Sequence, residues 1–447
     1  MFQSFLVLTV QLSFDLFNKL KMKLFSQWRS FSMSSPRIKL NNLLFGLPNQ
    51  NLTSEETIEQ LVKFERFLIF FRASLGFIQN VSHRSTKTDY YGLIIRAICR
   101  IYLIRLICLA VIDDEDYQLY LGDIAYKTKY RSMINVLFVI GFLIGVGIKE
   151  WFVLYDKSGK NSVLTIYSDI INHGFEPVHL KMTSNQAIKF HRTIHILVTQ
   201  LNRNFTFSCL FLAAVYYSVL LFNPHFYQTK EFIFYSLVWS LVAIITIFSV
   251  DATYFAIFGY LILIQVYYLF RLESVVELAD SYRQLKCTDE LASTFIKYTC
   301  KHLNQWEKCA KLTGVLVFCV FTAIAFICDL FIFYGFIMNF HSPLFANSFG
   351  SIGCIFCLVI ACLSLIGREF IIKIERLYSR LHVIWRYNVF NVYNRFKILQ
   401  LMERLNGPYN GIQLGSITTI GKDFSVRFML EIGSSLMLLT CNFKRYF

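Results

Sequence analysis

Seven long apolar segments alternate with polar segments along this chain of 447 residues. Several of them are near the length of about 20 residues that a helix needs to cross the hydrocarbon core of a bilayer. Helices are the expected form, because no water satisfies backbone groups at that depth. The pattern predicts an all-α polytopic membrane protein with seven transmembrane helices, at residues 92–112, 131–154, 206–223, 232–270, 313–340, 344–366 and 425–443.

The fourth apolar segment, 232–270, is too long for one simple crossing, since it would extend roughly 58 Å as a continuous helix. Either it crosses twice, with a tight turn at Asp251, or it is one helix that projects into the cytoplasm. Segments 271–312 and 367–424 are both basic and both need to be on the inner side. This favours the single long helix.

Lys and Arg are concentrated in alternate connections. Segments 1–91, 149–205, 271–312 and 367–424 carry 11, seven, seven and nine of them. The other connections are poor in them: 113–130 has only Lys127 and Lys129 against five carboxylates, and 341–343 has none. The positive-inside rule then places the N-terminus in the cytoplasm. An odd number of spans places the C-terminus outside, the reverse of a G-protein-coupled receptor.

The net charge of +15 follows from the same bias, so nucleic acid is not an expected partner. The expected partner is the lipid bilayer.

We expect four parts: a cytoplasmic N-terminal segment, 1–91, with an interfacial helix at 63–79; six transmembrane helices with a ligand-binding outer half, 92–366; cytoplasmic anchor helices, 367–424; and a seventh helix with a short extracellular tail, 425–447. The amphipathic pattern of 367–406 continues the sixth span inward until Gly407 and Pro408.

The polar residues form no pattern typical of an enzyme or of a bound cofactor. The 12 cysteines are scattered, mostly inside the apolar segments, which gives no support to a disulfide framework. His191 and His195 have the i, i+4 spacing of a zinc helix but lack the accompanying glutamate, so a solvated helix face is the better interpretation. We expect no catalytic residues, no metal and no cofactor.

Three short segments carry a resemblance to a known family. They are FRASLGFIQ at 71–79, LGSITTIGKDFSVRF at 414–428, and SLMLLTCNF at 435–443. With the predicted layout, they resemble the insect gustatory receptors of the insect chemoreceptor superfamily. The third segment matches that family's motif of Thr-Tyr, five hydrophobic residues and Gln-Phe. Ser435 keeps a hydroxyl, Asn442 keeps an amide and Phe443 is retained, whereas Leu436 replaces the tyrosine.

The resemblance implies a ligand-gated, non-selective cation channel, built as a homo- or hetero-tetramer with related receptors. The seventh helix of each subunit would line one central pore for permeant cations. The ligand would be an external small-molecule tastant, and the channel would lie in the plasma membrane of sensory neurons. The weakened motif leaves open whether the chain conducts as a homomer.

The last helix mixes polar and apolar side chains as a pore requires, because amides and hydroxyls help to solvate an ion and an apolar ring can close by dewetting. The candidate pore-lining residues are Ser435, Leu436, Leu439, Asn442 and Phe443. The alternative is an ordinary membrane helix with small polar residues at a packing face.

Aromatic residues with a few polar neighbours gather toward the outer halves of the predicted helices, as a small-molecule pocket requires. The same residues would serve equally as the aromatic belt at the membrane interface. The candidate ligand-binding residues are Tyr130, Tyr216, Tyr217, Trp239, Asp329, Tyr334, Ser348 and Ser351.

Arg105 and Asp329 are charged residues at comparable depth in the first and fifth spans. Each alone would be costly in hydrocarbon, so one hypothesis pairs them or places both at the ligand cavity. The alternative directs Arg105 outward to Asp113 and Asp114 and leaves Asp329 protonated.

The sequence is also compatible with two other functions: an odorant-type receptor subunit that needs a co-receptor, and a polytopic transporter. The predicted topology also makes a separate claim. The sequons at Asn51, Asn80 and Asn204 all lie on the cytoplasmic side, so none of them should carry a glycan.

Overall fold

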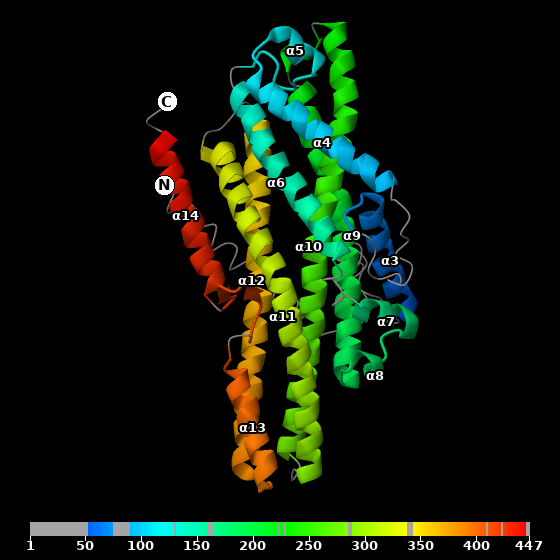
Figure 1. The fold of residues 1–447 in the computed structure, drawn as a ribbon, viewed down its shortest axis with the longest axis vertical. Coiled ribbons are helices and arrows are strands. Elements are labelled where there is room, and N and C mark those ends of the chain that lie inside the picture. The colour runs from blue at the N-terminus through cyan, green and yellow to red at the C-terminus, as the bar shows by residue number, and fades with distance from the viewer. Residues whose placement is uncertain are drawn as a thin grey trace, which may run out of the picture.

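The computed structural model describes residues 52–74, 90–128, 131–158, 165–221, 223–227, 229–284, 288–337, 343–407, 410–421 and 423–443. These residues are almost entirely helical (Figure 1). The helices are α3 (Ser54–Phe70), α4 (Tyr90–Val111), α5 (Glu115–Tyr120), α6 (Arg131–Lys157), α7 (Thr165–His173), α8 (Pro177–Leu180), α9 (Ser184–Leu221), α10 (Lys230–Gln284), α11 (Asp289–Ile332), α12 (Pro343–Tyr387), α13 (Val392–Leu405) and α14 (Phe424–Phe443).

Three short elements complete the fold. A 3-10 turn, η3 (Pro224–Tyr227), joins α9 to α10, and a π-helical turn, η4 (Phe333–Ile337), ends α11. A two-stranded antiparallel hairpin, β1 (Gln413–Leu414) and β2 (Thr418–Thr419), leads into α14, with Gln413 opposite Thr419.

The described residues of the seven apolar segments lie almost entirely within helices, which confirms the predicted all-α class. Five helices, α6, α9, α10, α11 and α12, are long and apolar enough to cross a membrane by length and composition. The chain is therefore a multi-pass membrane protein. The number of seven spans and the sides of the two termini stay predictions. α4 and α14 are the two further helices that this number requires.

The fourth apolar segment belongs to one helix. α10 runs unbroken from Lys230 to Gln284, so the alternative of two crossings with a turn at Asp251 is wrong. The Asp251 carboxylate is accommodated inside the bundle because α9 supplies donors: Ser208 Oγ lies 3.1 Å from Oδ1 and Cys209 Sγ 3.7 Å from Oδ2.

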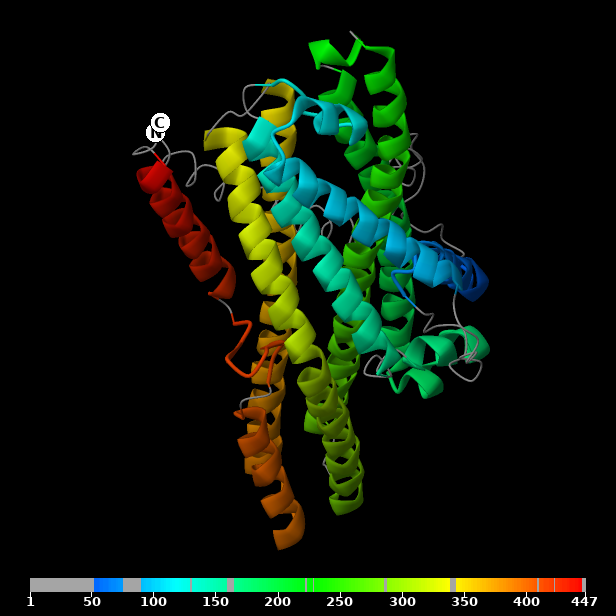
Figure 2. The same ribbon diagram turned by 45° about the horizontal axis from the view of Figure 1, so that its top comes forward.

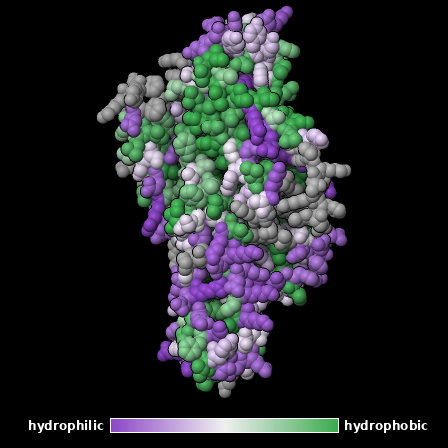
Figure 3. Space-filling model, viewed as in Figure 1, coloured by the Kyte–Doolittle hydropathy of each residue, from purple (hydrophilic) through white to green (hydrophobic). Residues whose placement is uncertain are grey.

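The acidic connection between α4 and α6 lies at the same end of the molecule as the α9–α10 turn. Asn223 Nδ2 donates to the carbonyls of Ile124 and Tyr126, at 3.2 and 3.1 Å. Figure 1 shows both connections at the top. Apolar side chains cover much of this upper part in the space-filling view, and hydrophilic ones form a band below it (Figure 3). We call the upper end the acidic end.

At the opposite end, α10, α11 and α12 extend together and pack with α13 around one large apolar core. Figure 2 shows these extensions leaving the body of the molecule. The predicted continuous helix over 367–406 is wrong, because α12 ends at Tyr387 and α13 begins at Val392. Asn391 causes the break: its side chain caps α13 by accepting from Asn394 N at 2.7 Å.

Candidate functional site

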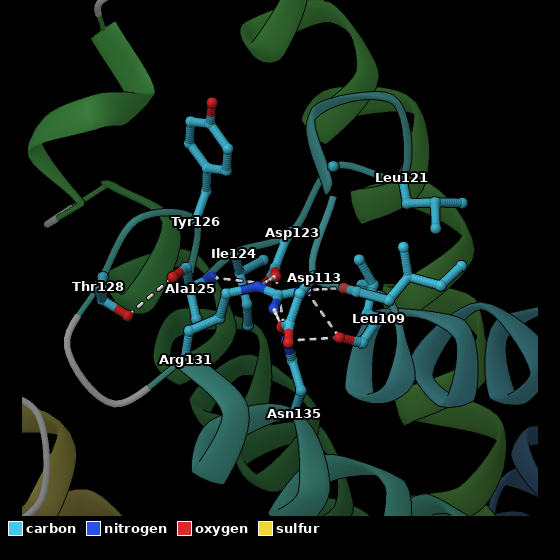
Figure 4. A network of polar contacts seen from close by, with 12 residues as sticks. Leu109, Asp113, Leu121, Asp123, Ile124, Ala125, Tyr126, Thr128, Arg131 and Asn135 are labelled. Atoms are coloured by element: carbon cyan, nitrogen blue, oxygen red, sulfur yellow. Dashed lines mark hydrogen bonds and ion pairs between the residues drawn. The ribbon is translucent and has the colours of Figure 1, made fainter. Parts of the chain in front are cut away.

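A buried ion-pair network holds the acidic connection over the bundle (Figure 4). Arg131, the first residue of α6, donates from Nε to Asp123 Oδ2 at 2.6 Å and from Nη1 to Asp113 Oδ1 at 3.0 Å. Its Nη2 donates to the carbonyls of Leu109 and Ile112 at the end of α4. Asn135, one turn further along α6, donates to the same oxygen of Asp123 at 3.0 Å.

Arg105 fastens the other side of this connection. Its Nε and Nη2 donate to the carbonyls of Leu121 and Gly122, both at 2.6 Å. The guanidinium carbon also lies 5.1 Å from the ring centre of Trp239 and 5.4 Å from that of Tyr102. Loop carbonyls and ring faces thus stabilise this buried cation.

The hypothesis that Arg105 pairs with Asp329 is therefore wrong, since Arg105 is engaged at the acidic connection and Asp329 lies beside Ser435. The alternative pairing is wrong too. Asp113 binds Arg131, and Asp114 caps α5 by accepting from Asp116 N at 2.9 Å.

Three of the candidate ligand-binding residues come together beneath the connection. Tyr216 is buried on α9, and its ring lies 5.8 Å from that of Tyr217. Tyr217 Oη lies 3.5 Å from Ser240 Oγ on α10. Tyr334 of η4 packs against the same cluster. We call this the outer aromatic cluster; its other aromatic members are Tyr102, Tyr126, Phe138, Phe142, Phe226, Phe232, Phe331 and Phe349.

The remaining candidates have separate environments. Trp239 donates from Nε1 to the carbonyl of Tyr120 at 3.2 Å, which holds the acidic connection. Ser351 is exposed and donates to the carbonyl of Asn347 in its own helix, at 2.7 Å. Ser348 is half-buried on α12. Tyr130 lies outside the described residues.

α14 attaches to the bundle along one face only. Leu436 is 1% exposed and packs with Ile432 against Cys328 and Phe333. Ser435 lies beside the Asp329 carboxylate of α11. Figure 1 shows α14 at the edge of the molecule. Its opposite face is exposed within the chain and carries Ser434, Met437, Leu438, Cys441 and Asn442.

Of the candidate pore-lining residues whose side chains the structure describes, only Asn442 is exposed. Ser435 and Leu439 are half-buried, and Leu436 faces the chain's own core. The side chain of Phe443 lies outside the described part. Tyr334 packs against both the outer aromatic cluster and the core under α14, so it connects the two regions.

Among the described residues, an open surface hollow lies on α4 around Arg96 and Arg100, and a cavity of about 250 Å³ lies between α7, α10 and α11, away from the acidic end. None of the candidate ligand-binding residues lines either.

His191 and His195 both contact Thr57 Oγ1, at 2.9 and 3.1 Å, and no group of described side chains there could hold a metal ion.

The roles of Asp123 and Arg131 were missed by the sequence interpretation, which counted Asp123 only as a loop charge and placed Arg131 at the start of a predicted span. A signal was present: an arginine opens an apolar segment directly after a connection with five carboxylates. Lys149 was missed as well. It is fully buried on α6 and binds the carbonyl of Phe71 at 3.2 Å and the Ser249 hydroxyl.

No protein-family model and no curated protein matches the sequence. Solved structures do match in fold. The insect olfactory receptor OR5 from Machilis hrabei in complex with eugenol superposes with a TM-score of 0.60 at 12% identity, over 86% of this chain and 99% of that one. A second structure of that receptor gives a TM-score of 0.61 with the same coverage and identity. This chain has an insect olfactory receptor fold. The resemblance to the insect chemoreceptor superfamily is thereby confirmed at the level of fold.

Proposed function

We propose that the chain is a subunit of a ligand-gated, non-selective cation channel that senses an external small molecule, and that it is of the gustatory type. Four subunits, identical or related, would surround one pore in the plasma membrane of a sensory neuron. The fold supports a receptor channel of this superfamily, and the quoted sequence segments favour the gustatory branch.

The position of α14 is the observation that carries the proposal. A helix bound along one face leaves its other face for neighbouring subunits and for a pore. That face combines the Ser434 hydroxyl and the Asn442 amide with Met437 and Leu438, a mixture that suits ion passage and closure by dewetting. Leu436 would anchor the helix to its own subunit, while Asn442 and Phe443 would stand in the conduction path.

The outer aromatic cluster is the proposed ligand region, because flat apolar walls and a few hydroxyls suit a small molecule. Its connection to α14 supplies a route for gating. Tyr334 contacts both regions, and five residues earlier in the chain Asp329 meets Ser435. A ligand that displaces Tyr334 would therefore change the packing beneath α14.

The second candidate is an odorant-type subunit that conducts only with a co-receptor. The observation in its favour is that the matched structures are of an olfactory receptor, one of them in complex with eugenol. A polytopic transporter has no comparable support.

Recording from planar bilayers that contain the purified chain tests the channel proposal without a known ligand. We expect unitary openings with little discrimination between sodium and potassium, more frequent in the presence of an active compound from a panel of sugars, bitter compounds and phenols. Openings only after addition of a co-receptor would favour the odorant type. Solute flux without unitary steps would indicate a transporter and overturn the proposal.

A further inference from the structure

The 250 Å³ cavity between α7, α10 and α11 is lined by an unusual set of charges. Lys181, Arg271 and Lys308 are its cations, and the exposed Asp169 is its carboxylate. Taken together these lining residues carry an excess of positive charge. An excess of this kind attracts anions, most strongly where the walls are partly desolvated.

The cavity lies at a defined depth. Arg271 directly follows the apolar part of α10 that ends at residue 270, and Leu312 directly precedes the apolar part of α11 that begins at 313. Both helices therefore change from apolar to polar at the level of the cavity. With the predicted spans and the positive-inside rule, this level corresponds to the lipid headgroups on the side of the basic connections.

Arg271 carries the argument among the three cations, because it is buried to 1% exposure and has only neutral partners among the described residues. Its Nη1 donates to Gln305 Oε1, and the phenols of Tyr267 and Tyr298 lie within hydrogen-bonding reach of the guanidinium. Nε and Nη2 are buried without a well-aligned acceptor in that part of the chain. A buried cation whose partners are all neutral is expensive unless an anion completes it.

The surrounding groups do not supply that anion. His302 is fully buried beside Arg271, and burial followed by the Arg271 charge lowers its pKa to about 3, so the ring is neutral. Lys181 adopts a left-handed backbone at φ 54° after α8, and its carbonyl accepts from Tyr298 Oη. Burial lowers the pKa of Lys181, and the charges of Arg271 and Lys301 lower it further. Like charges thus face each other across the cavity.

We propose that this cavity binds a phosphate monoester, held by the guanidinium of Arg271 and by the ammonium groups of Lys181 and Lys308. Arginine presents two parallel donors to phosphate oxygens, and lysines add charge without fixed geometry. The phosphate would tie the segment after α8 to α10 and α11. It would come from an inner-leaflet lipid headgroup or from a soluble phosphorylated compound.

The experiment uses the purified full chain in nanodiscs. Thermal unfolding is measured with inorganic phosphate, with soluble inositol trisphosphate, and with discs that contain either phosphatidylinositol bisphosphate or phosphatidylserine. We expect stabilisation by the phosphate monoesters and none beyond background by phosphatidylserine, a diester. Stabilisation only in discs that contain phosphatidylinositol bisphosphate identifies a lipid source, and stabilisation by soluble inositol trisphosphate in discs without that lipid identifies a soluble one.

Variants locate the site. Lys308→Gln and Lys181→Gln should each weaken binding about tenfold, as expected for loss of one hydrogen bond between charged groups. Lys297→Gln is the matched control, because it is exposed on α11 roughly 16 Å along the helix from Lys308. Arg271→Gln should abolish binding; if it fails to fold, the two lysine variants still decide. Equal binding by all lysine variants, or stabilisation by none of the monoesters, would overturn the proposal.

Discussion

Replacing Asp123 by asparagine should destabilise the protein far more than the same change at Asp113, although both carboxylates bind Arg131. The side chain of Asp123 is 0% exposed and that of Asp113 is 94% exposed. Asp123→Asn keeps the shape but removes the charge, which leaves the Arg131 guanidinium, itself 11% exposed, without its buried partner.

Removing one member of a buried pair costs about 3–5 kcal/mol, whereas an exposed pair contributes little. Arg131 keeps the carbonyls of Leu109 and Ile112, so the lower end of that range, about 3 kcal/mol, applies here. At about 2 °C per kcal/mol for a large chain, Asp123→Asn should lower the unfolding midpoint by about 5 °C or more.

Fluorescence-detected size-exclusion chromatography after heating measures these midpoints in detergent. Asp113→Asn should leave the midpoint close to that of the wild type. The double variant Asp123→Asn with Arg131→Gln should lose less than the two single variants combined, because it leaves no unpaired charge. Equal midpoints for Asp123→Asn and Asp113→Asn would refute the reasoning that burial decides the strength of this network.

Three further predictions concern packing, pH and the rejected ion pair. Gly335→Ala should prevent folding, since its Cβ would overlap with the backbone nitrogen of Gly350. Gly141→Ala should be neutral, because nothing lies within 4 Å of the added Cβ; surface expression compares the two variants. Burial lowers the pKa of His191 from 6.5, so the folded state disfavours the protonated imidazole. The contact between His191 and Thr57, through which α3 docks, should therefore weaken as pH falls below about 6.5. Hydrogen-exchange protection of α3 should fall between pH 7.5 and 5.5 in the wild type and change less in His191→Gln with His195→Gln. Exchanging the charges, Arg105→Asp with Asp329→Arg, should not restore the surface expression that either single variant loses. Recovery of expression in the double variant would support an ion pair between Arg105 and Asp329.

The sequence predicted the helices well because long apolar runs leave the backbone no alternative in a membrane. It also chose correctly between one and two helices over 232–270, from the charges of the connections that follow. It failed at the end of α12, where the amphipathic pattern continues through residues 388–391 and only the capping side chain of Asn391 marks the break.

The candidate site was predictable only in part. Apolar periodicity places Tyr216, Tyr217 and Tyr334 at one end of the bundle, but helix rotation decides which of them meet. Rotation also turned Leu436 toward its own subunit and Arg105 toward two carbonyls, and no spacing in the sequence fixes either direction. The Arg131 network combines two carboxylates, which the sequence shows, with backbone carbonyls, which it does not.

Thiol modification at Cys441 tests the central claim, that the exposed face of α14 borders the ion path near the outer surface. Cys441 is exposed on that face, and Leu436 is buried on the other. A charged, membrane-impermeant thiol reagent applied from outside to a conducting receptor should change its current, and Cys441→Ser should abolish the effect. Leu436→Cys in the Cys441→Ser background should stay insensitive. A wild-type current that is unaffected from outside, together with block in the Leu436→Cys variant, would contradict the account.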